Sequence, residues 1–166
     1  MKKLKIYLET STISHLDQQD AHLLMAETHK LWNLIKADQY DAVISNVAVD
    51  EINRCEEDKR STLFGYVAEI DYTFVAIDAH GLKIASRFVD LGVLRQKSFN
   101  DCQHIAAAIT SGCDVIVSWN FKHIVNHKTM MGVKAVTALE GYDDILIYTP
   151  SILIGGEFND PQYSKT

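Results

Sequence analysis

Residues 98–120 have the sequence SFNDCQHIAAAITSGCDVIVSWN, in which a helical pattern runs directly into a short apolar strand. Apolar side chains of the helical part recur with the spacing of one helix face, at Ile105, Ala106, Ile109 and Cys113. The expected strand, residues 114–118, contains the uninterrupted run Val-Ile-Val, which is typical of a strand covered on both faces of a sheet. This unit therefore predicts a layered α/β fold.

Four other runs are equally short, apolar and rich in β-branched or aromatic residues. The five expected strands cover residues 5–9, 42–45, 73–77, 114–118 and 145–148. Two more helical stripes lie between them, traced by Leu23, Leu24, Ala26, Leu31, Leu34 and Ile35, and by Leu82, Ala85, Phe88, Val89 and Val93. Strands that alternate with helices indicate a mostly parallel sheet.

The chain has 166 residues, a length that suits one domain. It contains two prolines and no Gly/Ser-rich linker or repeat, so we expect a single domain over residues 1–154. Residues 155–166 (GGEFNDPQYSKT) are polar and are expected to form a C-terminal tail.

Composition limits the classes of function. The chain has 16 Lys and Arg against 22 Asp and Glu, a net charge of −6, which disfavours a protein that binds nucleic acid through bulk positive charge. A bound metal ion could still supply positive charge locally. The three cysteines match no zinc or disulfide pattern, which favours a cytoplasmic location. No apolar run reaches the ~18 residues of a membrane helix, so no membrane association is expected.

Several catalytic motifs are absent from the sequence. It has no GxGxxG, no GxxxxGK[ST], no GxSxG and no HExxH. Acidic and polar residues near the ends of the expected strands remain, and ligands of open α/β sheets bind at that edge.

Four such residues stand out, namely Glu9, Glu51, Asp101 and Asn120. Each also has a purely structural interpretation. Glu9 could belong to a polar turn and Glu51 could be a solvated carboxylate. Asp101 could be a first-turn acid that favours the helix dipole, and Asn120 a turn-forming amide. Asn46 is expected to cap the helix that carries Glu51, and Ser98 the helix that carries Asp101. If the carboxylates converge, they need a cation. An all-oxygen site predicts Mg²⁺ or Mn²⁺.

Three stretches together resemble the VapC-like branch of the PIN-domain family. They are Ile6-Tyr7-Leu8-Glu9-Thr10-Ser11, the segment from Val43-Ile44-Ser45 to Glu51-Ile52, and the long segment from Asp101 through Trp119-Asn120-Phe121-Lys122-His123. The later Gly141-Tyr142 and Tyr148-Thr149-Pro150 are also similar to the end of that branch. The resemblance spans nearly the whole chain.

The resemblance implies a three-layer α/β/α sandwich around a parallel sheet of about five strands. It also implies a metal-dependent endoribonuclease, the toxin of a type II toxin–antitoxin pair, with RNA as substrate, a small antitoxin as partner, and a possible homodimer. By position, Glu9, Glu51 and Asp101 match the acids that bind Mg²⁺ or Mn²⁺ and act in catalysis. Ser11 and Asn120 would orient substrate or water.

Two departures from the family pattern leave alternatives open. Glu9 stands where the first acid is usually Asp, and neutral Asn120 stands where many members carry a fourth acid. These departures motivate a catalytically weakened PIN-like module that binds RNA or protein. A receiver-like or nucleotide-binding α/β domain is disfavoured by the missing glycine motifs.

A group of basic residues follows the fourth expected strand. It comprises Lys122, His123, His127, Lys128 and Lys134. These residues form either a solvated loop or a rim that contacts phosphates beside the proposed site.

Overall fold

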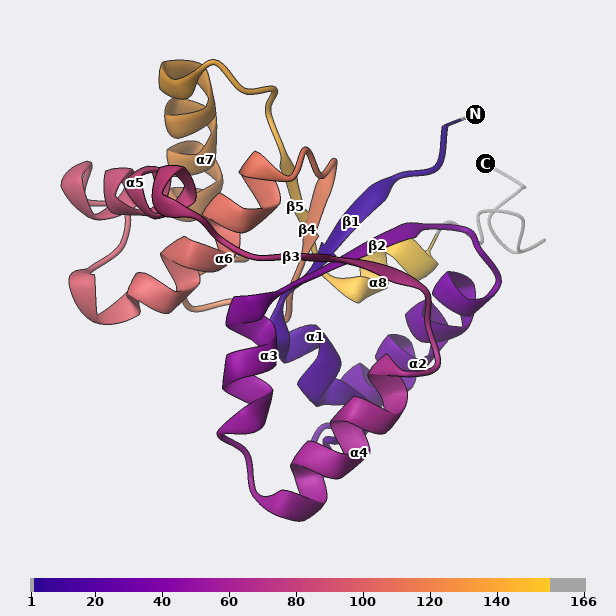
Figure 1. The fold of residues 1–166 in the computed structure, drawn as a ribbon. Helices are drawn as coiled ribbons and strands as arrows, with labels where there is room; N and C mark the ends of the chain where they lie inside the picture. The colour runs from indigo at the N-terminus through magenta and orange to yellow at the C-terminus, as the bar shows by residue number, and fades with distance from the viewer. Residues whose placement is uncertain (1, 156–166) are drawn as a thin grey trace.

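The computed structural model describes residues 2–155, and its centre is one sheet of five parallel strands (Figure 1). The strands are β1 (Lys5–Leu8), β2 (Asp41–Ser45), β3 (Tyr72–Val75), β4 (Val115–Val117) and β5 (Leu146–Tyr148). All five predicted strands are confirmed, with ends that differ by at most two residues.

Helices fill the connections between the strands. The elements before β3 are α1 (Thr10–Ser14), η1 (His15–Asp17), α2 (His22–Lys36), α3 (Asn46–Asn53) and α4 (Glu57–Val67). The later elements are α5 (Ala79–Asp90), η2 (Gln96–Ser98), α6 (Phe99–Thr110), α7 (His127–Glu140) and α8 (Pro150–Ile154).

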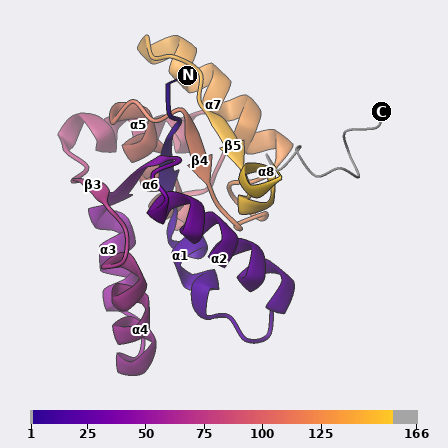
Figure 2. The ribbon, with the colours of Figure 1, turned by 90° about the vertical axis from the view of Figure 1, so that its right-hand side faces the viewer.

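The central strands β1 and β4 bury both of their faces. Tyr7 and Ile116 are register partners and pack into a core with α5, α6 and α7, whereas Leu8 and Val117 point to the other face and pack with α2, α4 and α8. Figures 1 and 2 show α5 and α7 on one side of the sheet and α2 and α4 on the other. The predicted three-layer α/β/α sandwich is therefore confirmed.

Two of the predicted helix stripes are partly wrong, and on α5 the residue concerned is Leu82, which is exposed. Leu23 is 81 % exposed at the start of α2, where Thr28, Leu31, Trp32 and Ile35 form the buried face instead. Because the buried face begins only at Thr28, the apolar residues of the first turn lie outside the core. The third stripe, on α6, is confirmed, since Ile105, Ala106 and Ile109 are all buried.

The strand order β3-β2-β1-β4-β5 creates a switch point beside β1. The chain adds strands on one side of β1 as far as β3 and then crosses to place β4 on the other side. The helices after β1 and β4 therefore leave in opposite directions, and the carboxyl ends of these two strands border the crevice where ligands of such sheets bind.

None of the helices between residues 2 and 155 combines the length and the apolar character that a bilayer span requires. Residues 156–166 of the predicted polar tail lie outside the described residues. The proposed domain boundary after residue 154 stays a prediction.

Candidate active site

The predicted site residues come from segments that follow three strands at the carboxyl edge of the sheet. Glu9 follows β1, Glu51 lies on α3 after β2, and Asn120 follows β4. Asp101 lies in the first turn of α6. The parallel strand order brings these segments to one edge, although Glu9 and Asn120 are more than 100 residues apart in the chain.

Glu9 closes β1 and caps α1. Its backbone N–H donates to the carbonyl of Val117 at 3.1 Å, which ties it to β4, and its side chain accepts a hydrogen bond from the Ser11 N–H. The carboxylate is only 4 % exposed. Burial raises the pKa of Glu9, and the nearby His104 counteracts part of that rise. Glu9 is thus a buried acid whose charge is costly.

Glu51 is paired with a buried histidine, His104. His104 on α6 is 1 % exposed, and its Nε2 contacts Glu51 Oε1. Thr10 donates its hydroxyl proton to the same carboxylate oxygen at 3.0 Å. Burial opposes ionisation of Glu51, but the His104 and Thr10 contacts outweigh it and lower the pKa of the carboxyl.

His104 links this carboxylate to the core of the domain. Its Nδ1 lies 2.6 Å from the hydroxyl of Tyr7, which lies 2.6 Å from the hydroxyl of Ser45. Ser45 in turn caps α3 by accepting from the Ala48 N–H. Ser45 therefore takes the capping role predicted for Asn46, which instead accepts from the Ile77 N–H at 2.9 Å.

The charge on His104 is favoured despite its burial. Burial alone lowers the pKa of an imidazole, but the hydrogen bond to Glu51 and the charges of Glu9, Glu51 and Asp101 outweigh it and raise the pKa of His104. All three carboxylates thus lie close enough to act on one imidazole. Of the three acids, Glu51 contacts His104 directly, and a shared metal position for Glu9, Glu51 and Asp101 stays a prediction.

Asp101 has its own pair of partners. His123 Nδ1 lies 2.9 Å from Asp101 Oδ2, and the Asn120 side-chain amide donates to Asp101 Oδ1 at 3.3 Å. Asn120 Oδ1 accepts from the His123 N–H at 3.0 Å, so the amide orients both residues. Burial raises the pKa of Asp101 and the histidines oppose that rise. Ser98 precedes α6 but its side chain makes no capping bond, so the predicted capping box is absent.

Ser11 joins α1 to the end of β4. Its hydroxyl accepts from the Trp119 N–H at 2.9 Å and lies 3.3 Å from the Ser118 hydroxyl. The Ser11 backbone N–H is already used by Glu9. The hydroxyl proton of Ser11 is therefore the group that this residue can offer to a ligand.

The carboxylates can be compared with what a divalent cation requires. Glu9, Glu51 and Asp101 carry the kind of oxygen donors that Mg²⁺ or Mn²⁺ prefers, and burial raises the pKa of Glu9 and of Asp101, a cost that a cation relieves. Within residues 2–155, no group of three His, Cys, Asp or Glu side chains is arranged around a common metal position. Glu51 and Asp101 face His104 and His123 instead. The donor chemistry fits a hard cation, which has to replace histidine contacts.

The cost of the buried Glu9 charge leads to a stability prediction. Glu9→Gln keeps an oxygen that can accept from the Ser11 N–H but removes the charge that burial disfavours. We expect the free energy of unfolding of the metal-free protein at pH 8 to rise by about 0.5–2 kcal/mol, the usual range for a single stabilising substitution. Thermal melts in EDTA measure this, with the exposed Glu57→Gln as the control. A lower melting temperature for Glu9→Gln would contradict it.

The contacts of His104 with Glu51 and Tyr7 were not predicted from the sequence, and His123 was expected only in a basic group that forms either a solvated loop or a phosphate-contacting rim. A signal for His104 was available, because it lies three residues after Asp101 and so shares its side of α6. The pairing of Tyr7 with His104 joins residues 97 positions apart and left no local signal.

Comparisons with known proteins give a match among solved structures. No protein-family model and no curated protein matches the chain. Among solved structures, it is similar to Mycobacterium tuberculosis VapC20, described as a Sarcin-Ricin loop cleaving toxin, with a TM-score of 0.56 and 14 % sequence identity. The match covers 85 % of this chain and 98 % of that one. At this identity the likeness concerns architecture, and together with the strand order it shows that the chain has a VapC-like PIN fold.

Proposed function

We propose that this protein is a divalent-metal-dependent endoribonuclease of the VapC type, the toxin of a type II toxin–antitoxin pair. One observation carries the proposal: at the strand-order switch of a VapC-like fold, Glu9 follows β1, Glu51 contacts His104, and Asp101 contacts Asn120 after β4. The similar VapC20 is an RNA-cleaving toxin, which supports RNA as the substrate class.

In this proposal, Glu9, Glu51 and Asp101 hold Mg²⁺ or Mn²⁺. When bound, such an ion lowers the pKa of a water and offsets charge on the phosphate. Glu9 supports this role because its burial penalises a charge that His104 and the Ser11 N–H offset only in part. A carboxylate of the same group accepts the proton of the attacking water, and the family resemblance implies a product with a 5′-phosphate.

Ser11 and Asn120 act as positioning groups in this proposal. The Asn120 amide holds Asp101 Oδ1 and also orients His123. The Ser11 hydroxyl is fixed by the Trp119 N–H, so its own proton can be donated to a phosphate oxygen. Both residues therefore orient the carboxylates and the substrate without changing the charge of the site.

The partners follow from the same proposal. They are RNA, a small antitoxin that blocks the site, and a second copy of the chain in a homodimer. A cytoplasmic location agrees with the three cysteines, which are free thiols. A short neighbouring reading frame that encodes a DNA-binding protein would support the toxin assignment.

A weakened binding module is the second candidate. The contacts of His104 with Glu51 and of His123 with Asp101 favour it, because they already pair two of the three acids in the absence of an ion. A module of this kind would bind RNA or protein but not cut it. The two candidates differ in their response to metal.

Metal addition tests the proposal. We expect the purified protein to cut RNA with Mn²⁺ or Mg²⁺ and to stop when EDTA is added. Mn²⁺ at 100 times its dissociation constant should stabilise the protein by about 2.7 kcal/mol. For a domain of this size the melting temperature should then rise by roughly 5–10 °C.

Calorimetry separates the two candidates. The nuclease proposal requires measurable binding of Mn²⁺ at millimolar concentration or below. No binding heat and no shift in melting temperature, together with retained RNA binding, would favour the weakened module. Ca²⁺ provides a control, since a hard cation should bind the acids while supporting cleavage poorly.

A further inference from the structure

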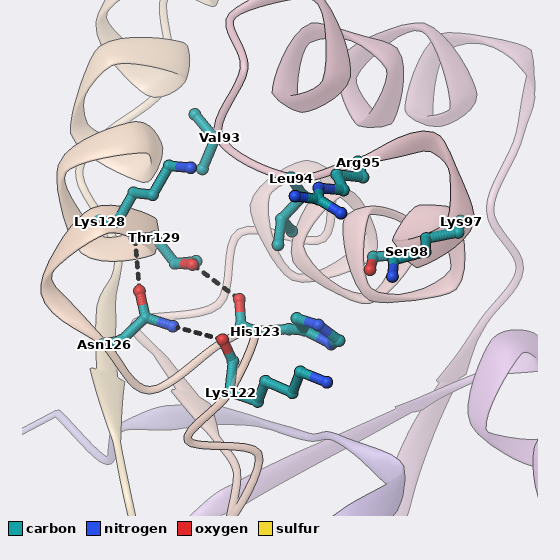
Figure 3. A pocket seen from close by; sticks show the side chains of 10 residues that line it. All are labelled: Val93, Leu94, Arg95, Lys97, Ser98, Lys122, His123, Asn126, Lys128 and Thr129. Atoms are coloured by element: carbon teal, nitrogen blue, oxygen red, sulfur yellow. Dashed lines mark hydrogen bonds between the residues drawn. The ribbon is translucent and has the colours of Figure 1, made fainter.

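A basic cavity lies beside the candidate active site and has no part in the catalytic proposal so far. Its volume is about 370 Å³, within the usual range for ligand sites. One wall is the segment between α5 and α6, with Arg95 and Lys97, and the other is the segment from β4 into α7, with Lys122 and Lys128 (Figure 3). The basic cluster predicted from sequence is therefore only half of this feature, and neither His127 nor Lys134 lines it.

The cavity concentrates positive charge that nothing nearby neutralises. Arg95, Lys97, Lys122 and Lys128 are exposed, and none forms an ion pair with another residue of the described part of the chain. No acidic side chain among residues 2–155 lines the cavity. Lys134, in contrast, is paired with Asp144. In a chain with a net charge of −6, such an uncompensated group of cations favours an anionic ligand.

The wall that runs from β4 into α7 is held in place by hydrogen bonds from side chains to backbone carbonyls. Thr129 donates its hydroxyl proton to the His123 carbonyl at 2.6 Å, and the Asn126 amide donates to the Lys122 carbonyl at 3.1 Å (Figure 3). Asn126 also caps α7, so the positive end of a 14-residue helix lies at the same wall. The loop is therefore shaped before any ligand arrives.

His123 connects the cavity to the carboxylates. It lines the cavity, and its Nδ1 lies 2.9 Å from Asp101 Oδ2. A polyanion with regularly repeated charges that occupied the candidate active site would therefore continue past His123 into the cavity. An acidic peptide could also pair with the cations, but only an RNA substrate would occupy the carboxylate site and the cavity at the same time.

We propose that this cavity binds phosphates of the RNA backbone adjacent to the one that is cut. The assignment rests on the proposed ribonuclease function and adds the path of the RNA, which runs from the carboxylates past His123 into the cavity. Arg95 contributes a planar guanidinium that can grip a phosphate through two hydrogen bonds, and the lysines contribute point charges.

Salt-dependent RNA binding tests the cavity. The probe is a fluorescein-labelled, mixed-sequence 12-nucleotide RNA in EDTA, followed by anisotropy between 50 and 300 mM NaCl. The R95Q/K97Q variant should bind roughly 10- to 30-fold more weakly at 100 mM and reduce the salt slope by about 1.4, since each phosphate contact on a single strand contributes about 0.7. K128Q should reduce the slope by about 0.7.

K2Q/K30Q is the matched control, because it removes the same charge at the amino end of β1 and on the exposed side of α2. It should leave the slope nearly unchanged. An unchanged RNA affinity and salt slope for R95Q/K97Q would overturn the proposal. It would also be overturned if this variant bound RNA normally but lost affinity for a labelled 12-residue polyglutamate peptide, because the cavity would then bind an acidic protein segment. All variants change exposed residues, so we expect them to be folded. Melting temperatures equal to that of the unmodified protein would confirm this.

Cleavage assays keep this proposal separate from the ribonuclease proposal. With Mn²⁺ and RNA, R95Q/K97Q should raise KM about tenfold or more while kcat stays within about a factor of two, because uniform binding is lost and the carboxylates are untouched. If the unmodified protein cuts no RNA, the ribonuclease proposal fails. The binding experiment in EDTA still shows whether the cavity binds RNA.

Discussion

Asp101→Asn is expected to lower kcat/KM for RNA cleavage by more than about 100-fold. Loss of groups that only support a metal ligand already costs about 10–100-fold, so loss of a ligand itself should cost more. Asparagine has nearly the shape of aspartate, and the Asn120 and His123 contacts surround the same position. The fold should therefore persist, and gel-based cleavage with Mn²⁺ measures the loss.

Asp50→Asn is the matched control for this experiment. Asp50 lies next to Glu51 on α3, is exposed, and loses the same unit of charge. Its cleavage rate should stay within about a factor of two of the unmodified protein, because a single exposed charge contributes little. Equal cleavage by Asp101→Asn and the unmodified protein would remove Asp101 from the site.

His104→Leu is expected to lower the free energy of unfolding of the metal-free protein by about 2–4 kcal/mol. The substitution removes the partner of the fully buried Tyr7 hydroxyl and of the Glu51 carboxylate, and buried polar groups that lose a partner cost about 1–3 kcal/mol each. The melting temperature should fall by roughly 5–15 °C. Urea denaturation in EDTA measures the free energy.

The pH dependence of this loss has a definite sign. The pKa of His104 is raised in the fold, so its stabilising charge is fully present below the ordinary histidine value near 6.5 and is lost as pH rises through the folded pKa. The stability difference between the unmodified protein and His104→Leu should therefore be largest near pH 6 and shrink at higher pH.

His22→Leu is a suitable control, because His22 is exposed at the start of α2 and should give a small difference at every pH. A stability difference for His104→Leu that grew with pH would contradict a cationic His104.

The five strands were predictable because their signal is local. Residues 115–117 are Val-Ile-Val with no polar interruption, and β4 is found there. Glu9 was predictable as a candidate for the same reason, since it directly follows a buried strand. The details of capping were not predictable: Ser45 and Asn46 are both good caps, and only the position of Ile77 gives Asn46 a different partner.

The α/β class and the strand positions follow from the order of neighbouring residues, because periodicity and strand ends are local properties, and the same signal singles out Glu9, Glu51 and Asp101 as candidates. The surroundings of those acids depend on the folded chain. The parallel order of β2, β1 and β4 brings His104 against Glu51, 53 residues away, and places Arg95 and Lys97 across a cavity from Lys122 and Lys128. Such contacts depend on which strands pair, and strand pairing is decided by the packing of the whole chain.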